Sequence, residues 1–509
     1  MSIVLGLDVG TSGTKAVAIN AAGRPVASAL VEYPLLTPKP GWAEQPPAEW
    51  KRAALEALTK LAHSPNVEPA EVKGLGLTGQ MHGSVFLDQD HRVLRNAILW
   101  CDQRTAKQCE YITEKVGARN LIEMVCNPAL TGFTAPKILW LRDHEPEIYD
   151  RVRKVLLPKD YVRYALTGEF ATDVADASGT LLFDVKNRGW HKGLMELLDI
   201  PAEFMPNAYE GPEVTGTLSK EAAAATGLPE GIPVVAGGGD QAAGGVGCGI
   251  VRTGVLSSTV GTSGVVFAFA DRVSLDPEGR VHTFCHSVPG KWHMMGVVLS
   301  AGGSLRWYRD ALCAEEKARA AETGRDPYEY ITDAAATVPP GAEGLLFLPY
   351  LTGERTPHKD PYARGAFVGL SLRHGKPHLA RAVLEGVAYA MRDSLDIIRG
   401  MGVPVQQVRA SGGGAKSAFW RQVQADVNGA PLATINVDEG PAYGAAILAT
   451  VATGLYASVE EACDAIIHVV DTCEPDAART KQYDTWFAEY QNAYTALAPG
   501  FRRAADLLS

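Results

Sequence analysis

Asp240 stands where an α/β protein commonly places a catalytic carboxylate. It follows the apolar run 232–236 and the three glycines 237–239. Ligands of open α/β sheets bind in the crevice beyond the carboxyl ends of the strands, so this side chain is expected to face a ligand. A carboxylate there can accept the proton of an attacking hydroxyl, as phosphoryl transfer requires. We favour this role over the alternative, in which Asp240 only caps the following segment.

Asp8 and Lys15 bound a loop of small polar residues, DVGTSGTK, that suits a phosphate. Small residues let backbone N–H groups approach a phosphate closely, and the hydroxyls of Thr11 and Ser12 add donors. Asp8 is placed to hold Mg²⁺, directly or through water, because magnesium commonly sits on one or two carboxylates and substrate phosphates. Lys15 would offset phosphate charge. For this loop alone, a plain hairpin turn is the alternative.

The same Gly-Thr-Ser-Gly sequence occurs twice, at 10–13 and at 261–264. Each copy follows a strand-like run and precedes another, which is Lys15–Asn20 in the first half and Val265–Ala270 in the second. The repetition favours a phosphate-binding role over a chance turn. It also predicts two lobes of similar plan that face each other.

Three consecutive glycines, 412–414, form a further candidate loop. They follow the strand-like run 408–410 and precede a helix expected from Ser417 to Val427, with Ser417 as its N-cap. A glycine loop before a helix start suits a nucleotide, because the backbone can come close and free N–H groups point outward. The alternative is an ordinary strand-to-helix turn, which would rarely need three glycines.

The segment 79–83, GQMHG, places polar side chains among small residues. Gln80 and His82 are able to hydrogen-bond sugar hydroxyls, and Met81 can pack on sugar carbons. A histidine satisfied within a turn explains the segment equally well. These residues alone therefore do not decide between a sugar-binding site and an ordinary turn.

Strands and helices alternate through both halves, which predicts α/β layers. Helices are expected over 48–63 and 378–399, where apolar residues recur at helical spacing. The uncharged stretch 440–459 is rich in Ala, Gly and Thr, so a buried, closely packed helix is favoured over a membrane span. We place the boundary between the lobes after residue 249.

Composition limits the classes of function. The chain has 509 residues, enough for two sizeable domains, and a net charge of −10 with no run of basic residues. Binding to nucleic acid is therefore not expected. The 8 cysteines form no Cys-x-x-Cys pair, which indicates free thiols in a reducing compartment. No signal peptide and no membrane contact are expected, and a homodimer is compatible with the sequence.

Taken together, these segments resemble the FGGY family of carbohydrate kinases, most closely its members that act on xylulose. The resemblance covers essentially the whole chain. It is carried by DVGTSGTK (8–15), GWAEQPPAEW (41–50), GQMHG (79–83), GFTAPKILWLRDHE (132–145), GGGDQAAG (237–244), FLPYLTGERTPH (347–358) and GGGAKSAFWRQVQAD (412–426).

The resemblance implies an actin/hexokinase-type fold, in which two ribonuclease H-like lobes flank a central cleft. Residues 1–249 would form the N-terminal domain, with the sugar site, the first phosphate loop and the catalytic aspartate. Residues 250–509 would form the C-terminal domain, which binds the nucleotide. ATP, Mg²⁺ and a ketopentose are the implied ligands.

Site residues are carried over by position. Asp240 would be the proton acceptor and Asp8 the carboxylate on the metal side. The sugar would contact Met81, His82, Asp240 and Gln241. Gln241 stands where Asn is more usual, so the hydrogen bonds of this position to the sugar are left open. The nucleotide and its phosphates would contact Thr11, Ser12, Lys15, Gly261, Thr262, Gly302, Gly413 and Gly414.

The implied reaction is transfer of the γ-phosphoryl group of ATP to the 5-hydroxyl of D-xylulose, in the cytoplasm. One alternative is a kinase of the same family for ribulose, another ketose or a polyol, although the GQMHG segment favours xylulose. The other is an actin-like assembly or sensor protein that uses ATP as a switch. A catalytic aspartate beside a sugar segment argues against that second alternative.

Overall fold

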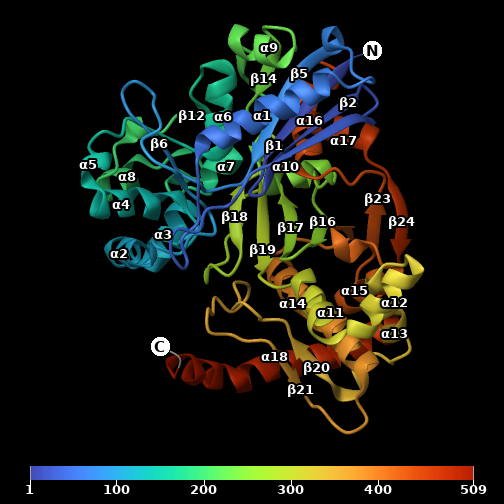
Figure 1. The fold of residues 1–509 in the computed structure, drawn as a ribbon. Coiled ribbons are helices and arrows are strands. Elements are labelled where there is room, and N and C mark those ends of the chain that lie inside the picture. The colour runs from blue at the N-terminus through green and yellow to red at the C-terminus, as the bar shows by residue number, and fades with distance from the viewer. Residues whose placement is uncertain (1, 508–509) are drawn as a thin grey trace.

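Two mixed β-sheets organise the chain in the computed structural model, which describes residues 2–507 (Figure 1). The first sheet has the strand order β13-β14-β5-β1-β2-β3, with β15 also paired to β5. Its strands are β1 (Ile3–Val9), β2 (Gly13–Asn20), β3 (Pro25–Glu32), β5 (Val72–Gly79), β13 (Val214–Thr217), β14 (Pro233–Val235) and β15 (Gly238–Gly239). The second sheet has the order β18-β19-β17-β16-β22-β23-β24. Its strands are β16 (Val255–Val260), β17 (Gly264–Ala270), β18 (His282–Cys285), β19 (Trp292–Val298), β22 (Gln407–Ser411), β23 (Leu432–Ile435) and β24 (Val469–Cys473).

The two sheets share one plan. In the first, β3, β2 and β1 are antiparallel, β5 and β14 continue in parallel with β1, and β13 closes the edge in antiparallel. In the second, β19, β17 and β16 are antiparallel, β22 and β23 continue in parallel with β16, and β24 closes the edge in antiparallel. The predicted α/β layers and the predicted pair of similar lobes are thus confirmed. One Gly-Thr-Ser-Gly loop joins β1 to β2 in the first sheet, and the other joins the equivalent strands β16 and β17 in the second.

The expected helices are present. The helix predicted over 48–63 is α1 (Pro47–Ala62), and the helix predicted over 378–399 is α14 (Lys376–Gly400). α1 buries one apolar face against the core of its lobe, whereas α14 is buried on all sides from Ala380 to Met391. The second half also contains α11 (Gly302–Leu312), α12 (Ala314–Thr323), α13 (Pro327–Ala336), α15 (Ala418–Asn428), α17 (Val459–Ile466) and α18 (Ala477–Asp506), besides a helix described below.

A group of helices is inserted between β5 and β14 and lies to the left of the first sheet in Figure 1. Its members pack around their own apolar cluster. They include α2 (Ala106–Val116), α3 (Ala118–Val125), α4 (Thr134–His144), α5 (Pro146–Tyr149) and α8 (Lys192–Leu197), while α6 (Pro158–Thr167), α7 (Val174–Ser178) and α9 (Lys220–Thr226) lie nearer the sheet. Small two-stranded sheets complete the fold, namely β4 (Glu44–Gln45) with β7 (Ala97–Ile98), β6 (Val85–Leu87) with β8 (Lys154–Leu156), β9 (Ala171–Asp173) with β12 (Asn207–Tyr209), β10 (Phe183–Asp184) with β11 (Gly189–Trp190), and β20 (Leu346–Leu348) with β21 (Ala366–Val368).

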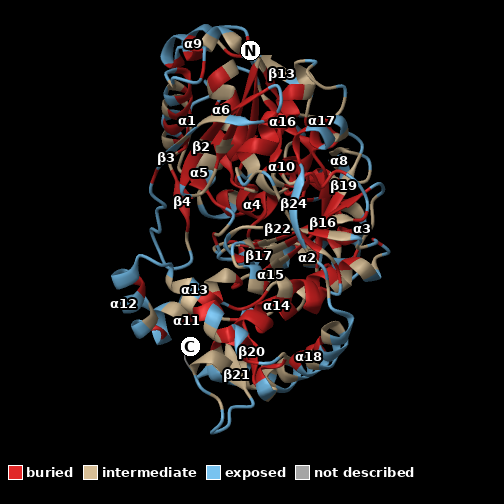
Figure 2. Cartoon of the chain, turned by 90° about the vertical axis from the view of Figure 1, so that its right-hand side faces the viewer, coloured by how far each residue is buried: buried red, intermediate tan, exposed pale blue. Residues whose placement is uncertain are grey.

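Two helices lie between the sheets, α10 (Asp240–Gly247) and α16 (Pro441–Ala452) (Figures 1 and 2). Each comes from one half of the chain and packs against the sheet of the other half. A Cβ atom added at Gly6 of β1 would lie 1.8 Å from the carbonyl oxygen of Ala442 in α16. A Cβ atom at Gly245 of α10 would lie 2.6 Å from the ring of Phe267 in β17. The uncharged stretch beginning at residue 440 is therefore the buried helix that the sequence predicted.

The two helices also pack against each other with their backbones in contact. A Cβ atom at Gly444 would lie 1.7 Å from the carbonyl oxygen of Ala243, so only glycine fits there. On the α10 side, a Cβ atom at Gly247 would lie 3.0 Å from the carbonyl oxygen of Gly440, so the close approach also favours a glycine there. No helix within residues 2–507 is long and apolar enough to cross a membrane. The boundary at residue 249 remains a prediction, since α16 belongs to the second half by sequence and covers the first sheet in space.

Candidate active site

Asp8 and Asp240 leave the first sheet at the same edge. Asp8 is near the end of β1, paired in parallel with Thr78 of β5, and Asp240 directly follows Gly239, which pairs with Gly79 of the same strand. Because both flanking strands run parallel to β5, their last residues meet beside its carboxyl end. Asp240 is the first residue of α10. The sequence therefore placed this carboxylate correctly at a strand end, and the structure adds that it begins a helix.

Burial governs the ionisation of both carboxyl groups. It raises the pKa of Asp240 to about 6, against hydrogen bonds from Gln241 that favour the ionised form. Burial and the nearby charge of Asp240 raise the pKa of Asp8 to about 7, while Lys15 acts in the opposite direction. A carboxyl group with a pKa close to neutral is suited to accept a proton and pass it on.

These pKa values predict the pH dependence of the reaction. A general base must be ionised, so kcat/KM for the acceptor should fall as the pH drops through the range of about 6 to 7 set by the Asp8–Asp240 pair. Below this range the decline should approach tenfold per pH unit. A pH–rate profile between about pH 4.5 and 8.5 measures it. A flat profile down to about pH 4.5 would exclude a base with a raised pKa.

The surroundings of Asp8 fit a divalent cation. Its Oδ1 atom is buried and has no hydrogen-bond partner within residues 2–507. A buried carboxylate oxygen normally has a partner, so an oxygen left free beside a phosphate loop suits Mg²⁺ or a water bound to it. Among the described residues there is no cluster of three or more metal-ligating side chains. Asp8 would accordingly share the ion with substrate phosphates and water.

The first Gly-Thr-Ser-Gly loop is held from behind by side chains. Tyr33 donates a hydrogen bond of 2.6 Å to the carbonyl of Gly10, and Gln80 donates one of 3.2 Å to the same oxygen. The hydroxyl of Thr11 accepts a hydrogen bond of 3.0 Å from Trp100 Nε1. These contacts fix the loop in place before any ligand binds.

Ser12 and Lys15, two of the expected phosphate ligands, differ in whether their side chains already have a partner. Ser12 is exposed and its hydroxyl makes no hydrogen bond within the described chain. Lys15 instead pairs with Glu439 at 2.7 Å, across the gap between the two halves of the sequence. The lysine expected to offset phosphate charge is thus bound to a carboxylate in this structure, and its role toward phosphate stays a prediction.

A cavity of about 660 Å³ brings together five of the residues expected to contact the nucleotide. They come from the second Gly-Thr-Ser-Gly loop, the start of α11 and the glycine loop before α15, and they are Gly261, Thr262, Gly302, Gly413 and Gly414. The volume falls within the range of small-molecule and cofactor sites. The other three, Thr11, Ser12 and Lys15, belong to the first lobe and do not line this cavity.

The loops around this cavity need small residues. A Cβ atom at Gly302 would lie 2.4 Å from the carbonyl oxygen of Gly261, and one at Gly414 would lie 2.5 Å from the side chain of Val260. Gly412 has φ +75°, a conformation that favours glycine. The predicted N-cap is confirmed, because the Ser417 side chain accepts a hydrogen bond from the N–H of Trp420 at the start of α15.

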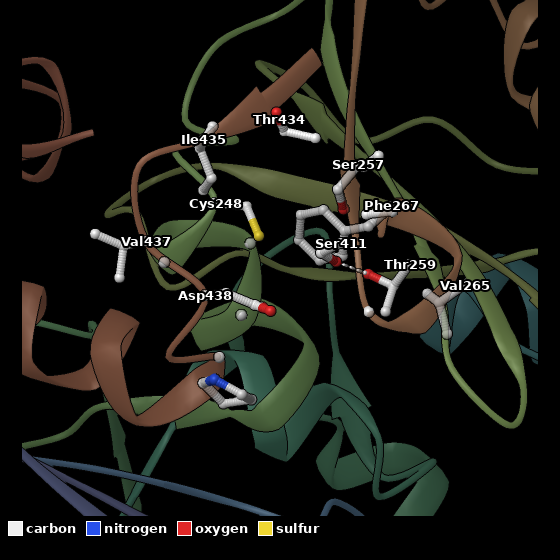
Figure 3. A pocket seen from close by; sticks show the side chains of 18 of the residues that line it. Cys248, Ser257, Thr259, Val265, Phe267, Ser411, Thr434, Ile435, Val437 and Asp438 are labelled. Carbon is white, nitrogen blue, oxygen red and sulfur yellow. Dashed lines mark hydrogen bonds between the residues drawn. The ribbon is translucent and has the colours of Figure 1, made fainter. Parts of the chain in front are cut away.

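A second cavity, of about 500 Å³, begins at Asp240 and Gln241 and runs between α10 and the second sheet (Figure 3). Its floor carries hydroxyl groups, and Thr259 and Ser411 are hydrogen-bonded to each other at 2.7 Å. Lys416 lines both cavities. The cavity lined by the glycine loop 412–414 and the cavity that reaches Asp240 therefore adjoin.

Met81 and His82 follow β5 and lie on the other side of Asp240. A Cβ atom at Gly239 would lie 2.8 Å from Met81 Cγ, so Met81 packs directly against the residue before Asp240. His82 has φ 68°, and its Nδ1 atom lies 2.8 Å from the carbonyl oxygen of Gly179. Burial keeps the pKa of His82 well below its usual range, so the ring is neutral. With Nδ1 as the donor to Gly179, Nε2 is left as a hydrogen-bond acceptor.

The left-handed backbone of His82 is held by Lys137. Its ammonium donates to the carbonyl of His82 at 2.8 Å and to that of Gly132 at 2.6 Å. Burial lowers the pKa of Lys137 to about 7. The hydroxyl of Thr134 donates to the same His82 carbonyl at 3.1 Å. The segment 79–83 is therefore held in place by side chains of α4.

A fully buried charge cluster on α6 supports both segments. Lys159 lies 2.6, 2.7 and 3.0 Å from carboxylate oxygens of Asp160, Asp173 and Asp176. Asp173 caps α7, which leads to the Gly179 carbonyl bound by His82. Arg163, one turn further along α6, donates to the carbonyl of Val235 at 2.7 Å and to that of Ala236, just before the glycines that lead to Asp240. One helix thus supports both the segment 79–83 and the segment that leads to Asp240.

Sequence reasoning missed Lys137, Lys159 and Arg163 as contributors to this region. Lys137 lies in the segment 132–145, one of those that carry the family resemblance. A basic residue in an apolar run, such as Lys137, is a signal of a buried, satisfied cation. Lys159 and Arg163 share one face of α6, and Asp160 beside them pairs with both. Their other partners lie elsewhere in the chain and carry no local signal.

Comparison with known proteins places these features in a family. The model of the FGGY family of carbohydrate kinases, N-terminal domain, matches residues 3–247, and that of the C-terminal domain matches residues 256–453. The xylulose kinase of Escherichia coli (strain K12) is 42% identical over 496 residues, which are 97% of this chain and 99% of that protein.

Solved structures of similar fold carry two different substrate names. A ligand-bound xylulose kinase from Lactobacillus acidophilus has a TM-score of 0.92 at 27% identity and covers 99% of this chain and 100% of its own. A gluconate kinase from the same organism has a TM-score of 0.91, also at 27% identity, and covers 99% of each chain. The fold alone therefore does not discriminate between acceptors.

Proposed function

The chain belongs to the FGGY family of carbohydrate kinases, and on that premise we propose that it transfers the γ-phosphoryl group of ATP to the 5-hydroxyl of D-xylulose. The products are D-xylulose 5-phosphate and ADP. The observation that carries this proposal is the contact of the sugar segment with the residue before Asp240, through Met81 and Gly239. Similarity to xylulose kinases supports the choice of acceptor.

Asp240 is proposed as the general base. The 5-hydroxyl oxygen attacks the γ-phosphorus in line, its proton passes to the Asp240 carboxylate, and the bond from phosphorus to the β,γ-bridging oxygen breaks. Position favours this role, because Asp240 begins α10 at the carboxyl edge of the first sheet. Its pKa of about 6 leaves it mostly ionised at neutral pH and still basic enough to take the proton.

The remaining predicted residues are assigned by their place around the cleft. Gly261, Thr262, Gly302, Gly413 and Gly414 line the cavity proposed for the nucleotide. The phosphates would extend from there toward Asp240 and the first loop, with Thr11, Ser12 and Lys15. Met81, His82 and Gln241 would contact the sugar. Asp8 would hold Mg²⁺, which when bound neutralises phosphate charge.

We place the reaction in the cytoplasm. The support is that Cys101, Cys109, Cys126, Cys248, Cys285, Cys313, Cys463 and Cys473 are all free thiols, as is typical of a reducing compartment.

A panel of acceptors tests the substrate. ADP formation should be followed by a coupled assay with D-xylulose, D-ribulose, L-ribulose, gluconate, xylitol and glycerol. We expect kcat/KM for D-xylulose to exceed that of each other compound by at least about tenfold, since a site that pairs buried polar groups with its substrate rejects analogues lacking them. A higher value for another ketose or polyol would replace xylulose within the same family. ADP formation with none of them, together with ATP-dependent polymers, would favour an assembly protein.

A further inference from the structure

Gln80 is a buried glutamine whose side chain turns toward the first Gly-Thr-Ser-Gly loop. Its backbone N–H donates to the carbonyl of Val9 at 2.9 Å, which places the residue beside the end of β1. Its side-chain amide lies 3.2 Å from the carbonyl oxygen of Gly10 and 3.2 Å from the hydroxyl of Thr11. The residue is only 2% exposed. The polar atoms of Gln80, which the sequence offered to a sugar, are therefore bound to the phosphate loop.

The orientation of this amide is determined by neighbours that can only accept or only donate. The Gly10 carbonyl only accepts, so the amide nitrogen of Gln80 faces it and the amide oxygen faces the Thr11 hydroxyl. The indole N–H of Trp100 only donates, and it lies 3.0 Å from the same hydroxyl. The Thr11 hydroxyl therefore accepts from Trp100 and gives its one proton to Gln80. No proton of this hydroxyl is left for a phosphate.

A second buried glutamine, Gln45, completes the arrangement. Its Nε2 donates to the carbonyls of Thr11 at 2.7 Å and of Pro34 at 3.2 Å. Its Oε1 accepts from Trp50 Nε1 at 3.0 Å and from Gln80 Nε2 at 3.1 Å. Each amide nitrogen thus uses both of its protons on fixed partners. A buried amide that is fully satisfied in this way is rigid, because any rotation would leave a polar atom unpaired.

Gln80 also adjoins the segment proposed for the sugar. Met81, the next residue, packs against Gly239, which directly precedes Asp240. Two neighbouring residues thus contact two parts of the proposed site. Gln80 binds the first phosphate loop, and Met81 lies against the residue before the proposed base.

We propose that Gln80, paired with Gln45, is a positioning residue that holds the first phosphate loop at a fixed distance from the acceptor, and is not a ligand of the sugar. The proposal rests on the proposed function and deepens it. Phosphate would then meet the backbone N–H groups of Thr11 and Ser12, which have no acceptor within residues 2–507. In-line transfer depends on this alignment, because a misplacement of about 1 Å can cost on the order of 10²-fold in rate.

The first test is Gln80→Met, which removes both ends of the amide at similar length. We expect kcat with D-xylulose and ATP to fall at least about tenfold, while KM for D-xylulose changes less than about threefold. Loss of a sugar ligand would give the opposite pattern, in which KM for D-xylulose rises and kcat changes little. Hydrogen exchange of residues 10–13, followed by mass spectrometry, should become at least about tenfold faster because the loop loses its support.

The second test is Thr11→Val, which removes the same hydrogen bond from the side of the loop. We expect kcat to fall at least about threefold with KM for ATP nearly unchanged. Combined with Gln80→Met, this substitution should cost little more than Gln80→Met alone, because both break one link. If the hydroxyl donates to phosphate instead, Thr11→Val would raise KM for ATP at least about tenfold in either background, and the proposal would be overturned. Thr11 is only half-buried, so this variant carries the test if Gln80→Met does not fold.

Gln108→Met is the matched control. Gln108 is a glutamine of similar burial, 4% exposed, that donates to Asp143 at 2.9 Å among the inserted helices. It should leave kcat, both KM values and the exchange of residues 10–13 unchanged. Unchanged kcat and exchange in Gln80→Met, or a rise in KM for D-xylulose alone, would overturn the proposal. If the wild type gives no ADP with D-xylulose, the proposed function fails instead, and the hydrogen-exchange comparison still tests the link between Gln80 and the loop.

Discussion

Replacing Asp240 with asparagine is expected to lower kcat by at least about 10²-fold while the protein stays folded and binds both substrates. The amide keeps the size of the carboxylate at the start of α10 but cannot take the proton of the attacking hydroxyl. Calorimetric titration with ATP and with D-xylulose measures binding, and the coupled assay measures turnover. Asp271→Asn, which alters an exposed carboxylate paired with Lys291 at 2.7 Å, is the control.

The same variant should be more stable than the wild type at alkaline pH. Burial raises the pKa of Asp240 in the folded state from 3.8 to about 6, so the folded protein binds a proton more tightly than the unfolded chain does. The stability from that proton is present at low pH and is lost as the pH rises through about 6. Asparagine carries no charge, so Tm at pH 8 should rise by on the order of 1–3 °C.

For the activity of the same variant, a turnover within about threefold of wild type would remove Asp240 from the mechanism.

Replacing Lys159 with methionine should destabilise the protein by about 3–5 kcal/mol. The side chain is fully buried and its ammonium contacts three aspartates at 3.0 Å or less. Burial alone would lower the pKa of Lys159, but the three carboxylates outweigh it and raise that pKa, so the group is charged. Methionine fills the space without the charge and leaves Asp173 and Asp176 buried without a cation, while Asp160 keeps Arg163 at 3.8 Å.

Urea unfolding at neutral pH measures this loss, with Lys60→Met as the control. Lys60 also forms an ion pair, at 2.8 Å with Glu56, but both side chains are at least 42% exposed. Such surface pairs contribute about 0–1 kcal/mol. The double variant Lys159→Met/Asp176→Asn should recover part of the stability, because it removes one unpaired carboxylate. Equal stability of Lys159→Met and Lys60→Met would show that the cluster does not support the fold.

The features that sequence reasoning placed well are those with local signals. Asp240 follows an apolar strand and three glycines, and each phosphate loop joins two strands, so neighbours in sequence were enough. The repeated loop predicted two lobes because each copy sits in the same strand context. The helix that begins at Asp240 was not predicted, because its glycines are explained by distant partners, Gly245 by the Phe267 ring and Gly247 by the backbone of α16.

The contacts that depend on distant partners were not predictable from one sequence. Lys15 has the positive charge expected of a phosphate ligand, yet its partner in the structure is Glu439, 424 positions away. Arg163 donates hydrogen bonds to the carbonyls of Val235 and Ala236, which follow the inserted helices in the sequence. Lys159 lies beside Asp160 in the chain, but its other two partners, Asp173 and Asp176, reach it only through the fold.

The position of α16 has a consequence for synthesis on the ribosome. The first sheet begins at Ile3, but one of its faces is covered by a helix that ends at Ala452. Nearly the whole chain must therefore leave the ribosome before the glycines of β1 and β5 meet their partner backbone. A nascent chain that has reached only residue 249 exposes this face and that of α10, so it should depend on chaperones, and the two halves should refold into an active enzyme only when mixed.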